Sequence, residues 1–78
     1  MSQNKIQVFI NGKKKYFSKN NNLFSLLNFL QVEKNGIAIE INQIVVPKSQ
    51  YKNKIIRNGD QIEIVQFIGG GWLEKRRL

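Results

Sequence analysis

The Asn11-Gly12 pair constrains the fold of this chain more than any other feature of the sequence. Asn-Gly favours a two-residue type I′ hairpin turn, because both central residues of that turn need positive φ. Residues 5–10 before it are apolar at every second position, which predicts a half-buried strand. Residues 13–17 after it are the predicted return strand, and their lysines are expected to protect an exposed sheet edge.

One amphipathic helix is predicted at residues 23–31. Three consecutive asparagines, residues 20–22, supply N-cap oxygens just before it. Leucines then recur at the helical spacing i, i+3, i+4, i+7. They are Leu23, Leu26, Leu27 and Leu30.

Three further strands are predicted after the helix. Residues 37–41 alternate isoleucine with other residues, and residues 44–46 form a short strand that Pro47 stops. Residues 48–54 form an irregular crossing segment. The turn residues 58–60 then precede a last strand at residues 61–68, which is rich in β-branched residues.

This order of elements predicts an α+β fold, with a mixed sheet of four to five strands and one helix packed across one face. The helix leucines are expected to pack against apolar residues of the sheet. Those residues are Ile6, Val8, Ile10, Ile39, Ile62 and Ile64.

The composition excludes most kinds of side-chain chemistry. The chain has 78 residues, enough for one domain with one modest core, and contains no cysteine or histidine. Thiol nucleophiles, disulfides, imidazole bases and the usual zinc ligands are therefore absent. Glu40, Asp60 and Glu63 do not converge with a base or metal cluster in the predicted layout. We expect no enzyme, no catalytic residue, no metal site and no bound cofactor.

No apolar run approaches the ~20 residues of a membrane helix, and residues 1–5 lack the apolar segment of a secretory signal. We expect no membrane association and a reducing compartment. Lysine, asparagine and isoleucine are abundant, as in AT-rich genomes. That composition suits a bacterial cytoplasm, or the plastid stroma if the gene is organellar.

The net charge of +8 raises the alternative of a basic RNA-binding module. The lysines are spread along the chain, however. Basic residues cluster only at 13–15 and 75–77, and neither cluster is interleaved with aromatic residues that stack on bases. No nucleic acid is therefore expected as a partner, and the RNA-binding module stays an alternative.

Several motifs in the second half fall at the spacing of one protein family. They are Ile41-Asn42, Val46-Pro47, Tyr51, Asn58-Gly59-Asp60-Gln61-Ile62-Glu63-Ile64 and Gly69-Gly70-Gly71. With these motifs the chain resembles the ThiS family, the sulfur carriers for the thiazole ring of thiamine. The resemblance covers roughly residues 5–71 and implies the ubiquitin-like β-grasp version of the predicted fold.

The resemblance also implies a function for the glycine triplet. A ThiF-type enzyme would use ATP to adenylate the carboxyl of Gly71, sulfur transfer would make a thiocarboxylate, and a ThiG-type thiazole synthase would receive the sulfur. Gly69 and Gly70 would form the tail, where the absence of side chains and the free φ of glycine let the chain extend into another active site. The alternatives are a flexible linker, or a carrier of molybdopterin synthesis, which shares the glycine tail.

Three apolar residues form a predicted partner-docking patch. If Ile62 and Ile64 face the helix, Val65 and Phe67 face outward, and Phe9 on the neighbouring strand joins them. This patch would receive the activating enzyme and the synthase. The alternative is ordinary sheet cover or self-association.

Family members normally end at the glycines, whereas residues 72–78 follow here. We therefore divide the chain into a carrier domain at residues 1–71 and an extension of unknown role at residues 72–78. Four alternatives explain the extension. A protease removes it, it is an artefact of the gene's assigned end, the carrier function has been lost, or the protein acts without adenylation.

Overall fold

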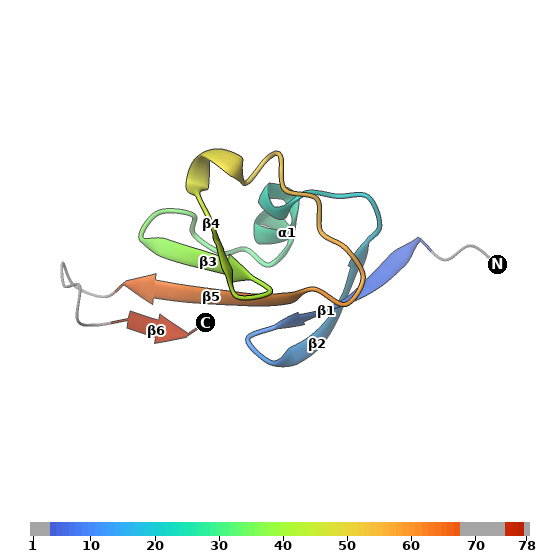
Figure 1. Ribbon diagram of the computed structural model, residues 1–78, viewed down its shortest axis with the longest axis horizontal. Helices are drawn as coiled ribbons and strands as arrows, with labels where there is room; N and C mark the ends of the chain where they lie inside the picture. The colour runs from blue at the N-terminus through green and yellow to red at the C-terminus, as the bar shows by residue number, and fades with distance from the viewer. Residues whose placement is uncertain (1–3, 68–74, 78) are drawn as a thin grey trace.

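A computed structural model describes residues 4–67 and 75–77 of the chain (Figure 1). The order of elements is β1 (Lys5–Ile10), β2 (Lys13–Ser18), α1 (Leu23–Phe29), β3 (Ile37–Ile41), β4 (Ile44–Val46), the 3₁₀ helix η1 (Lys48–Gln50), β5 (Gln61–Phe67) and β6 (Lys75–Arg77).

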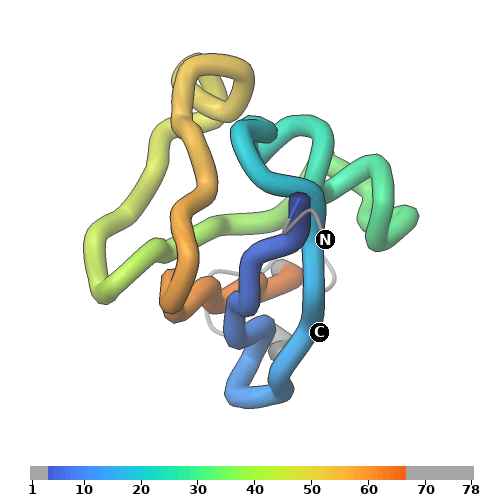
Figure 2. The backbone as a smooth tube through the Cα atoms, turned by 90° about the vertical axis from the view of Figure 1, so that its right-hand side faces the viewer, coloured from blue at the N-terminus to red at the C-terminus, as the bar shows by residue number. Residues whose placement is uncertain are grey.

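The strands form one mixed sheet in the order β2-β1-β5-β3-β4, with β6 pairing additionally with β5. The β1–β5 pair is parallel, and the other pairs are antiparallel. Helix α1 lies across one face (Figures 1 and 2). The predicted α+β layout is confirmed. Strand β6 is a sixth strand, one more than the predicted four to five. It was not predicted because its all-basic sequence has no apolar alternation that would indicate a strand.

The core lies between α1 and the sheet. Leu23, Leu26 and Leu27 are buried, and the six sheet residues predicted to meet them are buried too. Leu30 is half-buried and packs against the edge of this core, as predicted. Each fully buried aliphatic side chain stabilises the fold by ~1.5–3 kcal/mol. Five further residues complete the core, and their sequence patterns did not predict them: Phe17, Ile41, Val46, Tyr51 and Ile56.

Both ends of α1 have defined caps. The Oδ1 of Asn22 accepts a hydrogen bond from the backbone N–H of Ser25 at 2.8 Å, as the asparagine run predicted. Gln31 was the predicted last helical residue, but its φ of 60° ends the helix before it. The backbone N–H of Val32 then donates to the carbonyl of Leu27 at 3.0 Å, as in a Schellman cap. No helix in the described ranges has the length and apolar character needed to cross a membrane.

The predicted Asn-Gly hairpin is confirmed. Asn11 has φ 51° and Gly12 has φ 85°, and β1 and β2 pair on either side of them. A second turn with two positive φ angles joins β3 to β4 at Asn42 (53°) and Gln43 (70°). Strand β2 extends one residue beyond the predicted end. The predicted last residue of β5, Ile68, lies outside the described residues.

Candidate functional site

Strand β5 leads from the core towards the predicted tail. It lies in the middle of the sheet, between β1 and β3, and Ile62 and Ile64 are each 1% exposed against the helix. The strand ends at Phe67. The predicted site residues Gly69, Gly70 and Gly71 follow it in the chain and lie outside the described residues. The sheet therefore provides a rigid base for the segment that carries the predicted chemistry.

The face of the sheet away from α1, here called the open face, carries part of the predicted docking patch. Phe9 and Val65 lie on it and are half-buried. Phe9 is level with Gln61 in the register of β1 and β5, and Val65 is four residues further along. That separation is about 13 Å at ~3.3 Å per residue. Glu63 lies between them, so these two residues do not form a continuous apolar surface. The side chain of Phe67 is not described.

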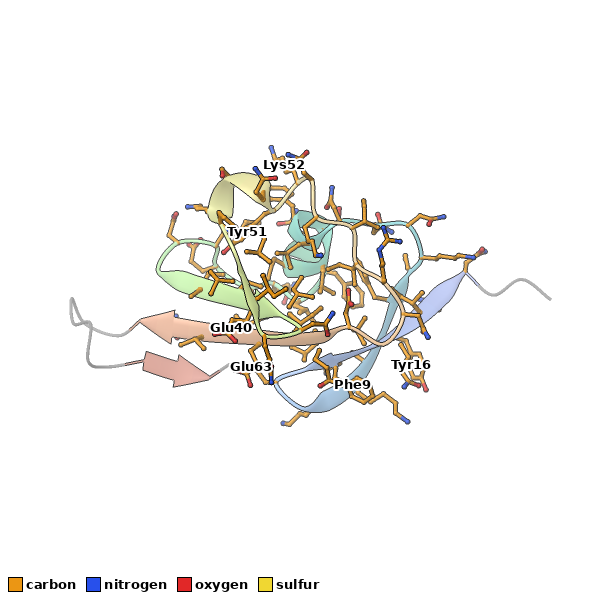
Figure 3. The ribbon with its side chains drawn as sticks, in the orientation of Figure 1. Phe9, Tyr16, Glu40, Tyr51, Lys52 and Glu63 are labelled. Carbon is orange, nitrogen blue, oxygen red and sulfur yellow. The ribbon has the colours of Figure 1, made fainter. Side chains whose placement is uncertain are left out.

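Two glutamates face each other on the open face. Glu40 on β3 is directly opposite Glu63 on β5 (Figure 3). Directly opposite like charges destabilise a strand pair, so this position favours a nearby cation. The two side chains contribute to an open pocket of about 670 Å³ between the β1–β2 and β3–β4 turns. Within the described residues, no group of three or more potential metal-binding side chains gathers.

The edge of β5 beside β1 has three successive partners. Pairing with β1 stops at Ile62, whose carbonyl accepts the backbone N–H of Asn11 at 2.8 Å. The side-chain amide of Asn11 then bridges Ile64, accepting its N–H at 2.8 Å and donating to its carbonyl at 3.3 Å. Beyond that, β6 pairs with β5 from Val65, opposite Arg77, onward. The sequence indicated Asn11 only as a turn residue, and no pattern signalled its second role.

The motif residues Asn42 and Asp60 join two turns at the start of β5. The amide of Asn42 donates to one carboxylate oxygen of Asp60 at 3.0 Å and accepts the backbone N–H of Gln61 at 3.0 Å. The other carboxylate oxygen accepts the backbone N–H of Arg57 at 2.8 Å. Asp60 is 8% exposed. These residues hold the sheet together at the opposite end of β5 from the glycines, so their role is structural.

The motif residue Tyr51 belongs to the core rather than to a reactive site. Its side chain is 3% exposed, and burial raises the pKa of its hydroxyl above the ordinary value of 10.0. Its carbonyl accepts the backbone N–H of Phe24 at 3.0 Å, which ties this segment to α1. Near it, Lys34 Nζ and Lys52 Nζ each lie 4.7 Å from the centroid of the Phe24 ring.

A mixed sheet crossed by one helix, whose central strand leads into a glycine triplet, defines the ubiquitin-like β-grasp class. The chain belongs to the ThiS family, whose family model matches residues 4–71. A solved structure of the thiamine biosynthesis protein (ThiS) from Geobacter metallireducens is similar with a TM-score of 0.75 and 26% identity. The match covers 85% of this chain and 100% of that structure.

Two further proteins are similar in sequence. The sulfur carrier protein ThiS of Escherichia coli (strain K12) is 33% identical over 66 residues, which cover 85% of this chain and 100% of that protein. A thiazole synthase of Paramagnetospirillum magneticum is 41% identical over 66 residues, or 85% of this chain. The chain spans only 20% of the length of that synthase.

Proposed function

We propose that this chain is a sulfur carrier of thiamine biosynthesis, which transports sulfur as a thiocarboxylate at Gly71. One observation carries the proposal. The central strand β5 leads directly into Gly69-Gly70-Gly71, and the family match ends at Gly71. The similar G. metallireducens structure is a thiamine biosynthesis protein and the P. magneticum relative is a thiazole synthase, which supports this function over a carrier of molybdopterin synthesis.

The reaction needs only the terminal carboxyl of the carrier. The Gly71 carboxylate attacks the α-phosphate of ATP and displaces pyrophosphate, giving an acyl-adenylate. A nucleophile at the hydrosulfide (HS⁻) level then displaces AMP from the acyl carbon, so that a C–S bond replaces the C–O bond to AMP and the sulfur loses its proton. The product is an ionised thiocarboxylate, and tethering to a protein raises its effective concentration at an acceptor. ATP belongs to the activating enzyme, and the carrier itself binds no cofactor.

The carrier acts as a substrate of other proteins and not as an enzyme. We propose a ThiF-type adenylating enzyme and a ThiG-type thiazole synthase as its partners. The thiazole synthase of P. magneticum supports the second partner, because a segment similar to this chain forms part of that protein. The bacterial cytoplasm or the plastid stroma would suit the carrier.

The docking patch is proposed to contribute Val65 and Phe67 near the tail, with Phe9 at its far end. The described geometry supports a contact that includes Val65, since this half-buried residue is two positions before the end of β5. Glu63 separates it from Phe9, so the two ends of the patch are expected to contact different parts of a partner.

The extension must be removed before the carrier is charged, because the carboxyl of Gly71 forms a peptide bond with Trp72. The test incubates the full chain and a chain ending at Gly71 with ATP and a ThiF-type enzyme. We expect pyrophosphate release and an acyl-adenylate mass only with the shorter chain. A control chain ending at Gly70 keeps the strands and the helix and shortens the tail by one residue. It should react more slowly. Equal reaction of the full chain would contradict the proposal.

A further inference from the structure

The last part of β5 would be an unprotected sheet edge without β6. Pairing with β1 stops at Ile62, and Asn11 covers only the backbone of Ile64. The backbone groups of residues 65–67 that point away from β3 would then lack a strand partner. Unpaired edges of this kind attract other extended segments. Strand β6 pairs there in antiparallel register, with Phe67 opposite Lys75.

The surface beside this edge is acidic, although the chain as a whole has a net charge of +8. Glu40 and Glu63 face each other on the open face, an arrangement that a neighbouring positive charge would relieve. Glu63 is two residues before Val65, and Val65 is opposite Arg77 in the register. The acidic pair and the paired strand are thus neighbours on β5.

The sequence of β6 complements this surface. Its three residues, Lys75, Arg76 and Arg77, are all basic. Three residue pairs are a short pairing for a terminal strand, and they add backbone hydrogen bonds with little apolar burial. Attraction between these basic residues and the glutamates would therefore strengthen the pairing. This attraction weakens with salt, because the site lies at the surface.

We propose that the β5 edge at residues 65–67, together with Glu40 and Glu63, is a docking site for a basic extended segment, which Lys75–Arg77 of the same chain occupy. Cleavage after Gly71 would then have two effects. It would free the carboxyl of Gly71, and it would leave the β5 edge at residues 65–67 without its strand partner. The docking of β6 does not depend on the sulfur chemistry at Gly71, and its test uses no activating enzyme.

The test is amide hydrogen exchange, followed by NMR, at residues 65–67. It compares the full chain, a chain ending at Gly71 and a Glu40→Gln/Glu63→Gln double variant of the full chain. We expect the amide of Gln66 to exchange about tenfold faster without the extension, because an unpaired edge opens freely. This amide points to β6, since backbone groups alternate along a strand and those of Ile64 point to Asn11 on the same side. The amide of Val65, which points to β3, serves as the internal reference, and its exchange should stay constant.

The double variant separates charge attraction from backbone pairing. Its Gln66 amide should exchange several-fold faster than that of the full chain at low salt, and the difference should shrink in 0.5 M salt. A Glu33→Gln variant, which removes an exposed charge outside the sheet, is the matched control and should leave the exchange unchanged. Equal protection in the full and shortened chains would overturn the docking. Unchanged exchange in the double variant would overturn the role of the glutamates.

Discussion

Asparagine side chains replace missing backbone partners at three places in the sheet. The amide of Asn11 bonds both backbone groups of Ile64, and that of Asn42 accepts the N–H of Gln61. Asn58 accepts a backbone N–H of β1 in the same way. An amide can both donate and accept, which suits positions where a strand ends and its neighbour continues. These three asparagines therefore maintain the positions of β1 and β5, and the proposed chemistry belongs to the carboxyl of Gly71.

The buried Tyr51 predicts a pH dependence of stability. Burial raises the pKa of its hydroxyl, so between about 10 and the raised value the native state keeps a proton that the unfolded state loses. The contribution of Tyr51 to the free energy of unfolding is complete below pH 10 and decreases as the pH rises through this window. Denaturant unfolding at pH 8 to 11 should show a smaller alkaline decrease for Tyr51→Phe than for the unchanged chain.

Tyr16 supplies the matched control for this measurement, because its side chain is 57% exposed. A Tyr16→Phe variant should keep the alkaline decrease of the unchanged chain. If Tyr51→Phe and Tyr16→Phe gave the same pH profile, burial of the Tyr51 hydroxyl would not be the cause.

At the level of elements, the β3–β4 turn contains a residue that its backbone does not favour. Gln43 has φ 70°, a left-handed conformation that costs a residue with a Cβ roughly 1–2 kcal/mol. Since Asn42 before it also has positive φ, Gln43→Gly would create the Asn-Gly pair that this turn prefers. We expect the free energy of unfolding to rise by about 1 kcal/mol, because glycine removes the strain and loses more chain entropy. Thermal and denaturant unfolding would measure this.

Gln50 provides the comparison for the turn variant. It ends η1 and is not among the residues with positive φ. Glycine has no strain to relieve there, so Gln50→Gly should lower the stability slightly. An equal gain from both substitutions would show that the conformation of Gln43 is not responsible.

Most elements could be predicted because each has a strong local pattern. Alternating isoleucines specified β1 and β3, and the leucine spacing specified α1. The end of α1 could not be predicted, because Gln31 is not a residue type that usually adopts positive φ. Strand β6 could not be predicted either, since its pairing depends on where β1 leaves β5. The glutamate pair needed the register of β3 and β5, which alternation alone leaves open.

For the candidate site, the sequence predicted which face of the sheet Phe9 and Val65 occupy, but not the distance between them. Phe9 and Val65 were correctly expected on the face opposite the helix, because alternation determines which side of a sheet a residue occupies. Their separation depends on the parallel register of β1 and β5, in which Phe9 is level with Gln61. The glycine tail was recognised by its position after a strand. Its structure lies outside the described residues and stays a prediction.

At the level of the whole molecule, the apolar core of the described residues lies before the glycines in the chain. The buried apolar core of the described residues runs from Ile6 to Ile64. The long-range pairings that close the sheet, β1 with β5 and β3 with β5, also involve residues up to Gln66. A domain of this size has a small free energy of unfolding, so each of these contacts contributes a large share of it. The tail and the extension follow the residues that form this core.

A chain ending at Gly71 should therefore fold as cooperatively as the full chain. Of the described contacts it loses the short pairing of β6 with β5, so we expect its free energy of unfolding to fall by less than about 1 kcal/mol. The dependence of that free energy on denaturant should stay nearly constant, because little surface is lost from the core. Urea unfolding followed by far-UV circular dichroism measures both. Loss of a cooperative transition would show that residues 72–78 are part of the folding unit, and removal before charging would then require a partner to stabilise the carrier.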